Sequence, residues 1–385
     1  MKRPSIFIVS TEFAPGPGGI GSHAYQVAKE LHNLGWKVTV FTEQANCPEE
    51  EITAFNNNSP FTVNRLYPTP SVALLLKKFL KIFFAALFQR PHLVMGTGKH
   101  GSWFGVLAGK LALVKTVVIG HGTEFISEMS PRSRKLNDWV YSKADGIIYV
   151  SHYTRKLAES AGIKNRSPFV IHNGADGTAF YALPAEDVQA FKTSKGLLDK
   201  KVIITVGNVQ PRKGHEFVIR ALPQILKHVP NAHYYCIGPP SIKTHLEGIA
   251  DQLQVSNHVH FTGRILNTEL IQWLNACDVF ALTSVVTEYG DVEGFGIVIV
   301  EAALCKKPAV VTGDSGPGEA IIAGETGLGV GERNVDEIAG AMVKLLADDK
   351  LCTGMGEKAH TNARNNLTWS NVVKKYDVAL KSLLK

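Results

Sequence analysis

The segment KVIITVGNVQPRKGHEFVIRAL, residues 201–222, indicates the fold class. Residues 201–207 are a short apolar run that ends at a glycine, as is typical of a buried parallel strand. Helical periodicity begins at Gly214, and Arg212 and Lys213 lie in the turn before it. A strand–turn–helix unit with two cations at the positive end of a helix dipole suits a diphosphate. The alternative is a solvated basic turn without a ligand.

The same alternation of strand-like and helical segments runs through both halves of the chain. It predicts an α/β protein with two doubly wound, Rossmann-like parallel sheets that face each other across a cleft, where ligands bind at the carboxyl ends of the strands. The expected strands are 5–10, 37–42, 92–96, 116–120, 146–151 and 168–174, followed by 201–207, 232–238, 258–263, 278–284 and 308–313. The expected domains are 1–185 on the acceptor side, a linker at 186–200, 201–365 on the donor side, and an amphipathic helix at 366–385 that packs back across the cleft.

Composition narrows the class of protein. A chain of 385 residues with 45% apolar and 19% charged residues suits two folded domains. The five cysteines contain no C-x-x-C pair, which argues against a disulfide framework or a structural zinc site. The start MKRPSIFIVSTEF resembles a buried strand rather than a signal peptide, and no apolar stretch is long enough to span a bilayer. We therefore expect a cytoplasmic protein. The histidines show no metal-binding spacing, so no metal site is expected.

One region of the first half is strongly basic. No acidic residue occurs between Glu51 and Glu124, and the helix-length segment SVALLLKKFLKIFFAALFQR (71–90) surrounds Lys77, Lys78 and Lys81 with Leu, Ile and Phe. Such a helix predicts peripheral contact with an anionic membrane surface, here the inner face of the cell membrane. The alternative is a core helix whose lysines face solvent. No nucleic-acid-binding motif accompanies the basic residues, so nucleic acid is not an expected partner.

A glycine-rich loop follows the first expected strand. In TEFAPGPGGIGSHAYQ (11–26), Gly16, Gly18 and Gly21 match G-x-G-x-x-G, and Glu43 ends the next strand about 20 residues on. This is the dinucleotide fingerprint and leaves an NAD-dependent oxidoreductase as an alternative. The loop is longer than the tight Rossmann turn and contains two prolines. It therefore predicts a phosphate-containing ligand without choosing which, with a plain loop as the alternative.

A second motif lies in DVEGFGIVIVEAAL (291–304). Glu293 and Glu301 are eight positions apart and enclose Gly294 and Gly296 at an expected strand-to-helix turn. Backbone N–H groups at such a turn hold phosphate oxygens, a glutamate on the helix accepts hydrogen bonds from ribose hydroxyls, and one at the loop tip meets sugar hydroxyls. Together with the Arg-Lys pair, the motif indicates a nucleotide-sugar site.

With these motifs the chain resembles the retaining GT-B glycosyltransferases of the large fourth family, also called glycosyltransferase group 1, which includes bacterial mannosyl-, glucosyl- and N-acetylglucosaminyltransferases. Glu293 and Glu301 match the family's E-x7-E element, and HGTE (121–124) its catalytic-loop histidine. TEYGDVEGFGIVIVEA is similar to the phosphatidylinositol-mannoside mannosyltransferase branch. The other matching segments are GGIGSHAYQVAKEL (18–31), SHYT (151–154), HNGAD (172–176), PRKG (211–214) and FTGRI (261–265).

The resemblance implies an activity and a set of roles. A hexose of the mannose, glucose or N-acetylglucosamine type would pass, with retained configuration, from a nucleotide diphosphate sugar to a hydroxyl of a glycan or lipid-linked acceptor, without a metal or other cofactor. His121 would bond the transferred sugar, Glu293 would orient its hydroxyls, and Lys213 would neutralise the leaving diphosphate. The implied donor-binding residues are Gly19, Asn208, Arg212, Lys213, Arg264, Ile265, Phe295, Gly296, Ile297 and Glu301. The base, among GDP, UDP and ADP, is not predicted.

Two positions depart from the family pattern. Asn208 stands where the family usually has an arginine, five residues before Lys213, and an asparagine lacks the bidentate grip of a guanidinium. Arg212 is the candidate replacement; the alternative is a nucleotide-sugar-binding protein without transfer activity. The loop DSGPGEAI (314–321) is one residue shorter than the family's glycine-rich loop, and Glu319 is expected to fill the position of its glutamate.

Overall fold

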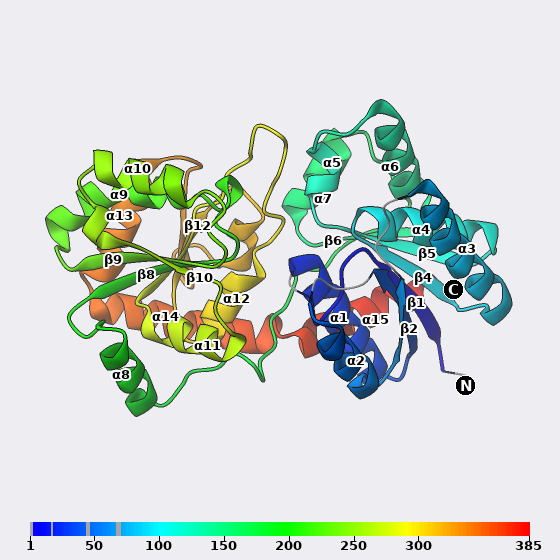
Figure 1. The fold of residues 1–385 in the computed structure, drawn as a ribbon, viewed down its shortest axis with the longest axis horizontal. Helices are drawn as coiled ribbons and strands as arrows, with labels where there is room; N and C mark the ends of the chain where they lie inside the picture. Colours follow the sequence, from blue (N-terminus) through cyan, green and yellow to red (C-terminus); the bar gives the residue numbers. More distant parts are fainter. Residues whose placement is uncertain (1–2, 17, 44–46, 67–70) are drawn as a thin grey trace. The chain divides into compact units, whose positions relative to one another are not determined.

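The computed structural model describes residues 3–16, 18–43, 47–66 and 71–385. The chain divides into two compact units (Figure 1). The first contains Met1–Asn173 and Trp369–Lys385, and the second Gly174–Thr368. Each is built on a parallel sheet with helices on both faces, which confirms the predicted doubly wound α/β class.

The first unit has a seven-stranded sheet in the order β3-β2-β1-β4-β5-β6-β7. One strand, β3, was not among those expected, because TVNRL at the sheet edge lacks the apolar run of a central strand. The strands are β1 (Ser5–Ser10), β2 (Lys37–Glu43), β3 (Thr62–Leu66), β4 (Leu93–Thr97), β5 (Lys115–Gly120), β6 (Gly146–Tyr149) and β7 (Pro168–Val170).

Helices cover both faces of this sheet. Figure 1 shows α1, α2 and α15 on one side, with α3 and α4 on the other. Ile82 of α3 and Val94 of β4 are fully buried in the core beneath α3. The helices are α1 (Gly19–Asn33), α2 (Glu49–Asn58), α3 (Val72–Gln89), α4 (Lys99–Leu111), α5 (Thr123–Ile126), α6 (Pro131–Lys143), α7 (His152–Ser160) and α15 (Trp369–Ser382). Among the described helices, none is long and apolar enough to cross a membrane.

The second unit has a six-stranded sheet in the order β10-β9-β8-β11-β12-β13. Its last strand, with the sequence GLGV, was not expected either, because four residues with two glycines carry little strand signal. The strands are β8 (Lys201–Val206), β9 (Ala232–Ile237), β10 (Val259–Gly263), β11 (Val279–Leu282), β12 (Ala309–Thr312) and β13 (Gly327–Val330).

The expected linker, residues 186–200, contains a helix of the second unit. Phe191 of α8 is buried and packs edge-on against Trp273 of α11, with ring centroids 5.4 Å apart. Figure 1 shows α9, α10 and α13 on one side of the sheet and α11 and α14 on the other. The helical elements are α8 (Ala185–Ser194), η1 (Pro211–Lys213), α9 (His215–His228), α10 (Lys243–Gln252), η2 (Ser256–His258), α11 (Asn267–Ala276), α12 (Ile297–Leu304), η3 (Pro317–Ala320), α13 (Val335–Leu346) and α14 (Asp349–Asn366).

The C-terminal helix α15 belongs to the first unit, although the second unit precedes it in the chain. It packs beside α1, and Trp36 Nε1 donates a hydrogen bond of 2.7 Å to Asp377 Oδ1. Tyr376 on the same helix is completely buried. The last helix is therefore part of the core of the unit that begins the chain.

In both sheets the strand order reverses next to the first strand of the unit. The reversal lies between β1 and β4 in the first sheet and between β8 and β11 in the second. Doubly wound sheets bind ligands at this switch point, beyond the carboxyl ends of the strands. Functional side chains are thus expected in the segments that follow β1, β4, β8 and β11.

Candidate functional site

Two cations and a carboxylate meet at the switch point of the second unit. Lys213 ends the short turn after β8, and Glu293 lies in the loop after β11. Lys213 Nζ is 2.7 Å from Glu293 Oε2, and Arg212 donates to the same oxygen. Arg212 and Lys213 therefore point the same way, although adjacent residues in a turn often diverge. The Lys213 and Glu293 side chains are only 10% and 13% exposed, so the cluster is largely shielded from water.

The charges in this cluster determine the ionisation of Glu293. Burial by itself would raise the pKa of the carboxyl group, but Lys213 and Arg212 outweigh it and lower the pKa to about 2. Glu293 is therefore ionised at neutral pH. Its negative charge holds the two cations in place. An anion that binds to these cations would have to compete with the Glu293 carboxylate for them.

Glycine allows the two strand ends to approach each other. Gly214 has φ 72°, and a Cβ at this position would lie 1.7 Å from the carbonyl oxygen of Thr283, directly after β11. A side chain here would push the β8 turn away from the β11 loop. Gly207 has φ 125°, and a Cβ there would be 3.1 Å from Cε of Lys213. The glycines before and after the Arg-Lys pair thus make room for its convergence on Glu293.

Glu301 is on α12, which begins directly after Gly296. Gly296 has φ 85°, and a Cβ there would lie 2.8 Å from Leu282 Cδ2, so glycine lets α12 start against the end of β11. Burial raises the pKa of Glu301 to about 7, although the charge of Lys213 opposes the rise. In the described structure no hydrogen bond or salt bridge engages its carboxylate, which leaves this group to accept from a ligand.

The short loop 314–321 packs against the tip of the Glu293 loop. A Cβ on Gly316 would lie 2.2 Å from the carbonyl oxygen of Gly294, so this backbone approach requires glycine. Glu319, expected to fill the family's glutamate position, lies half-buried in η3 of this loop. The one-residue shortening thus leaves the loop in contact with the E-x7-E segment.

The remaining predicted donor residues of the second unit lie in loops after strands or at the start of α12. Asn208 is exposed in the loop after β8, and Arg264 is exposed directly after β10 with the half-buried Ile265 beside it. Phe295 is only 1% exposed, so its side chain is part of the core. Ile297 is the first residue of α12. The structure brings Arg212, Lys213 and Glu293 into direct contact and leaves Asn208 outside that cluster.

His121 follows β5 in the first unit. Its Nε2 is 2.9 Å from Thr97 Oγ1, at the end of β4. Burial lowers the pKa of His121 to about 4, so the ring is neutral at physiological pH. A neutral imidazole donates a hydrogen bond with one nitrogen and accepts with the other, which suits a sugar hydroxyl.

Glu124 shapes the loop that carries His121. Its carboxylate accepts from the backbone N–H of His121 at 2.6 Å and of Gly122 at 2.9 Å. The hydroxyl of Tyr141 donates to the same group at 3.1 Å. Burial raises the pKa of Glu124, and these hydrogen bonds oppose the rise. Glu124 thus fixes the backbone of the HGTE segment.

The glycine loop does not present a free helix N-terminus. Gly18, with φ 139°, precedes α1, and a Cβ on it would lie 2.3 Å from Glu12 Oε2. The Glu12 carboxylate accepts a hydrogen bond from the backbone N–H of Gly21. Gly19 opens α1 with an exposed backbone and nothing near its Cβ position. The Cβ position of Gly19 is therefore open, while an internal carboxylate occupies part of the first turn.

Comparison with known proteins assigns the family. Residues 17–178 match the model described as Glycosyltransferase Family 4, and residues 187–362 match that of Glycosyl transferases group 1. A GDP-mannose-dependent alpha-(1-6)-phosphatidylinositol monomannoside mannosyltransferase from Mycolicibacterium smegmatis is 30% identical over 94% of this chain and 95% of its own length. The chain belongs to glycosyltransferase family 4. A monoacylated phosphatidylinositol monomannoside mannosyltransferase from Corynebacterium glutamicum is 28% identical over 94% of both chains.

Solved structures establish the fold of this glycosyltransferase as GT-B. Anabaena HepE in complex with UDP and glucose superimposes with a TM-score of 0.83 at 20% identity, covering 99% of this chain and 100% of the other. Sucrose-phosphate synthase from Thermosynechococcus elongatus gives a TM-score of 0.82 at 21% identity, covering 99% of both chains. Family membership decides against the NAD-dependent oxidoreductase. Glu43, its candidate ribose ligand, is instead paired with Lys78 at 2.7 Å.

One of the three lysines that were expected to face a membrane is instead buried. Lys78 is 5% exposed and turns into the protein to meet Glu43 at the end of β2, because an unpaired buried ammonium would be costly. Lys77 and Lys81 of α3 are exposed, as are Leu76, Leu80, Phe84 and Phe88, whereas Phe83 packs against the core. The transferase thus presents apolar and basic side chains together on α3.

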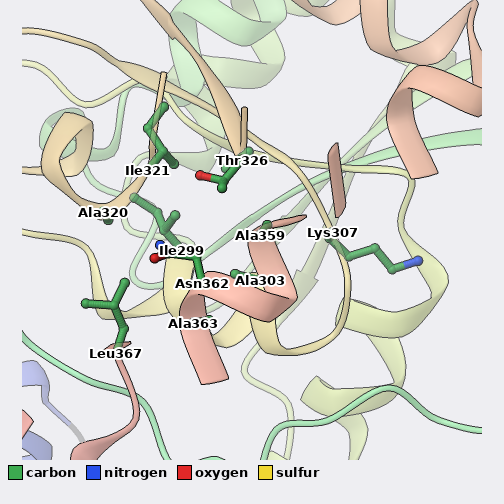
Figure 2. A pocket seen from close by; sticks show the side chains of 11 residues that line it. Ile299, Ala303, Lys307, Ala320, Ile321, Thr326, Ala359, Asn362, Ala363 and Leu367 are labelled. Carbon is green, nitrogen blue, oxygen red and sulfur yellow. The ribbon is translucent and has the colours of Figure 1, made fainter. Parts of the chain in front are cut away.

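A small pocket of the second unit lies apart from the candidate site. Figure 2 shows alanines and branched side chains between α12 and α14, with Lys307 reaching away from the others. None of the predicted donor residues lines it. The lining residues are Ile299, Ala303, Lys307, Ala309, Ala320, Ile321, Thr326, Ala359, Asn362, Ala363 and Leu367. The lining is mostly apolar, and none of the charged residues of the candidate site contributes to it.

Proposed function

We propose that this glycosyltransferase moves a hexose from a nucleotide diphosphate sugar to a hydroxyl acceptor with retention of the anomeric configuration. The observation that carries the proposal is the convergence of Arg212 and Lys213 on the buried Glu293, at the switch point of the second sheet. GDP-mannose is the favoured donor, because the mannosyltransferases similar to this chain over 94% of its length are GDP-mannose-dependent.

Lys213 and Arg212 act on the diphosphate. As the bond to the sugar breaks, negative charge develops on the leaving oxygen, and two fixed cations in a shielded site stabilise it. Arg212 supplies the second cation, which the family's usual arginine would provide at the position of Asn208. Since Glu293 balances both charges in the structure described here, the diphosphate takes over part of that role when the donor binds.

Glu293 and Glu301 orient the two sugars of the donor. Glu293, ionised because of its cationic neighbours, accepts hydrogen bonds from hydroxyls of the transferred hexose. Glu301 does the same for the ribose. The backbone N–H groups from Phe295 to Ile297, at the start of α12, face the phosphate oxygens, while Arg264 and Ile265 hold the edge of the base.

Retention follows if the acceptor hydroxyl attacks from the face that the diphosphate leaves. The departing oxygen takes the acceptor's proton, so no protein group has to ionise during the reaction. His121 stays neutral and bonds a hydroxyl of the transferred sugar. Neither a metal nor another cofactor is required, because the cations of the second unit supply the charge stabilisation.

The acceptor is lipid-linked, and α3 brings the enzyme to the inner face of the membrane. Leu76, Leu80, Phe84 and Phe88 are spaced four residues apart and are 56%, 37%, 46% and 78% exposed. They form one stripe of the helix, and exposed lysines flank it. Apolar anchors beside cations match a membrane with anionic head groups.

Calorimetric titration with GDP, UDP, ADP and NADH tests the donor site. We expect GDP to bind wild-type protein without added metal, and binding to be lost in Lys213→Ala. Proton NMR of the product should show an α-linked hexose from an α-linked donor. Binding of NADH alone would refute the proposal, and tight GDP binding without any transfer would favour the non-catalytic alternative.

Sedimentation with vesicles tests the membrane contact. Wild-type protein should sediment with vesicles that contain phosphatidylinositol, and Lys77→Glu with Lys81→Glu should abolish this. The matched control replaces Lys135 and Lys143, exposed lysines of α6 in the same unit, by glutamate. Equal loss of binding in both double variants would show that only net charge matters and would refute a specific role for α3.

A further inference from the structure

His23 of α1 lies between the candidate sugar-binding histidine and the C-terminal helix. It is completely buried, and its ring is perpendicular to that of His121, with centroids 5.1 Å apart. Its Nε2 is 2.9 Å from the hydroxyl oxygen of Tyr376 on α15. Trp369, at the start of α15, packs edge-on against the same imidazole at 5.4 Å. The last helix of the chain is thus one side chain away from His121.

The His23 ring keeps one nitrogen unpaired. Nδ1 has no hydrogen-bond partner among the described residues, although it is fully buried. Burial, and then the proximity of His121, lower the pKa of His23 well below 6.5, so the ring is neutral. A buried polar atom without a partner lowers the stability of the fold, whereas an apolar side chain of similar size would not. A residue that costs stability at this position indicates a role other than filling the core.

His121 depends on its surroundings for its orientation. Thr97 occupies its Nε2, and in the described part of the chain no group bonds its Nδ1. A neutral imidazole bonds a sugar hydroxyl usefully only if its plane and its tautomer are fixed. The hydrogen bond with Thr97 influences which nitrogen of His121 carries the proton. The perpendicular ring of His23 packs against the imidazole and thereby limits rotation of its plane.

We propose that Tyr376 and His23 are positioning residues of the transferase: the Tyr376 hydroxyl fixes the His23 ring, which in turn holds the His121 imidazole in its reactive orientation. The inference rests on the proposed role of His121 at the transferred sugar. It makes the C-terminal helix a part of the catalytic machinery of the first unit, and it involves no covalent step and no change of charge.

The test compares two substitutions on the same helix, one that removes a hydroxyl and one that removes a carboxylate. Tyr376→Phe removes only the bond to His23, whereas Asp377→Ala removes a bond of similar length, to Trp36, that also holds α15 in place. We expect Tyr376→Phe to lower kcat about tenfold, with unchanged GDP affinity and donor KM. Asp377→Ala should change kcat less than about twofold. Equal losses in the two variants would reduce Tyr376 to a docking contact and overturn the proposal.

Nitrogen NMR of histidine-labelled protein gives a readout that is independent of turnover. The His121 signals, assigned by their absence in His121→Ala, should report one tautomer in the wild type and in Asp377→Ala. In Tyr376→Phe they should shift and report a mixture, because an imidazole that is free to rotate no longer keeps the bond to Thr97 that selects the tautomer. Unchanged His121 signals in Tyr376→Phe would also overturn the proposal. If the wild type transfers no hexose from any donor, the proposed function fails, and the NMR comparison still decides whether Tyr376 controls His121.

Discussion

Replacing Glu293 by glutamine removes the negative charge that faces both Lys213 and Arg212. The two cations hold the pKa of Glu293 at about 2, against an ordinary value of 4.5. At about 1.36 kcal/mol for each pH unit, the ionised carboxylate stabilises the fold by about 3 kcal/mol at neutral pH. For a unit of this length, that loss lowers Tm by about 6–12 °C.

The pH dependence has a definite sign. Because the pKa of Glu293 is lowered in the folded protein, its stabilisation is complete above pH 4.5 and is lost as the pH falls toward about 2. The difference between wild type and Glu293→Gln should therefore narrow in acid. The control is Glu247→Gln, which breaks an exposed ion pair with Lys243, at 3.4 Å, and should change stability by less than about 0.5 kcal/mol.

Scanning calorimetry gives the stability, and titration with GDP gives the affinity. In Glu293→Gln the cations have no carboxylate partner, so GDP should bind at least as tightly as in the wild type while hexose transfer is lost. This combination of lower stability, retained binding and lost transfer is the expected result. A variant with wild-type Tm at pH 7, or one that no longer binds GDP, would refute the charge balance described here.

Three further predictions concern the same machinery. Arg212→Ala should weaken GDP binding about tenfold by calorimetry, because a charged contact is lost, whereas Asn208→Ala should change it less than about twofold; the reverse order would mean that Arg212 does not replace the missing arginine. Glu301→Gln should raise Tm at pH 8, because the folded pKa of about 7 makes the wild type less stable as the pH rises from 4.5 to 7. The same substitution should weaken GDP binding. A wild-type affinity for GDP would exclude contact between Glu301 and the ribose. His121→Ala should leave GDP binding intact and abolish transfer, and wild-type transfer rates would remove His121 from the site.

The sequence was sufficient for the features that local pattern encodes. The apolar runs and their helical partners predicted both parallel sheets, and the E-x7-E element placed Glu293 and Glu301 around α12. The edge strands β3 and β13 escaped because short, half-exposed strands lack a continuous apolar run. The expected linker holds α8 because its apolar face, including Phe191, is only recognisable once Trp273 is beside it.

Contacts between distant segments could not be predicted. The sequence around Lys78 contains no sign that it pairs with Glu43. From sequence alone, Lys78 therefore could not be distinguished from its exposed neighbours. The same holds for His23 and Tyr376, which are 353 positions apart. Thr97 ends a buried strand, and only its place at the switch point marks it as a partner for His121. Such residues are found from topology, because their role depends on which strand ends lie side by side.

We propose that the chain transfers a hexose while Lys213 and Arg212 stabilise the leaving diphosphate. The most direct measurement is mass spectrometry of vesicles containing phosphatidylinositol mannosides after incubation with GDP-mannose, with Lys213→Ala as the matched control. We expect a lipid that carries one additional hexose, formed together with an equal amount of GDP, in the wild type and not in the variant. Absence of any hexosylated product from GDP-mannose, UDP-glucose and UDP-N-acetylglucosamine, by a wild-type protein that binds the nucleotide, would contradict it.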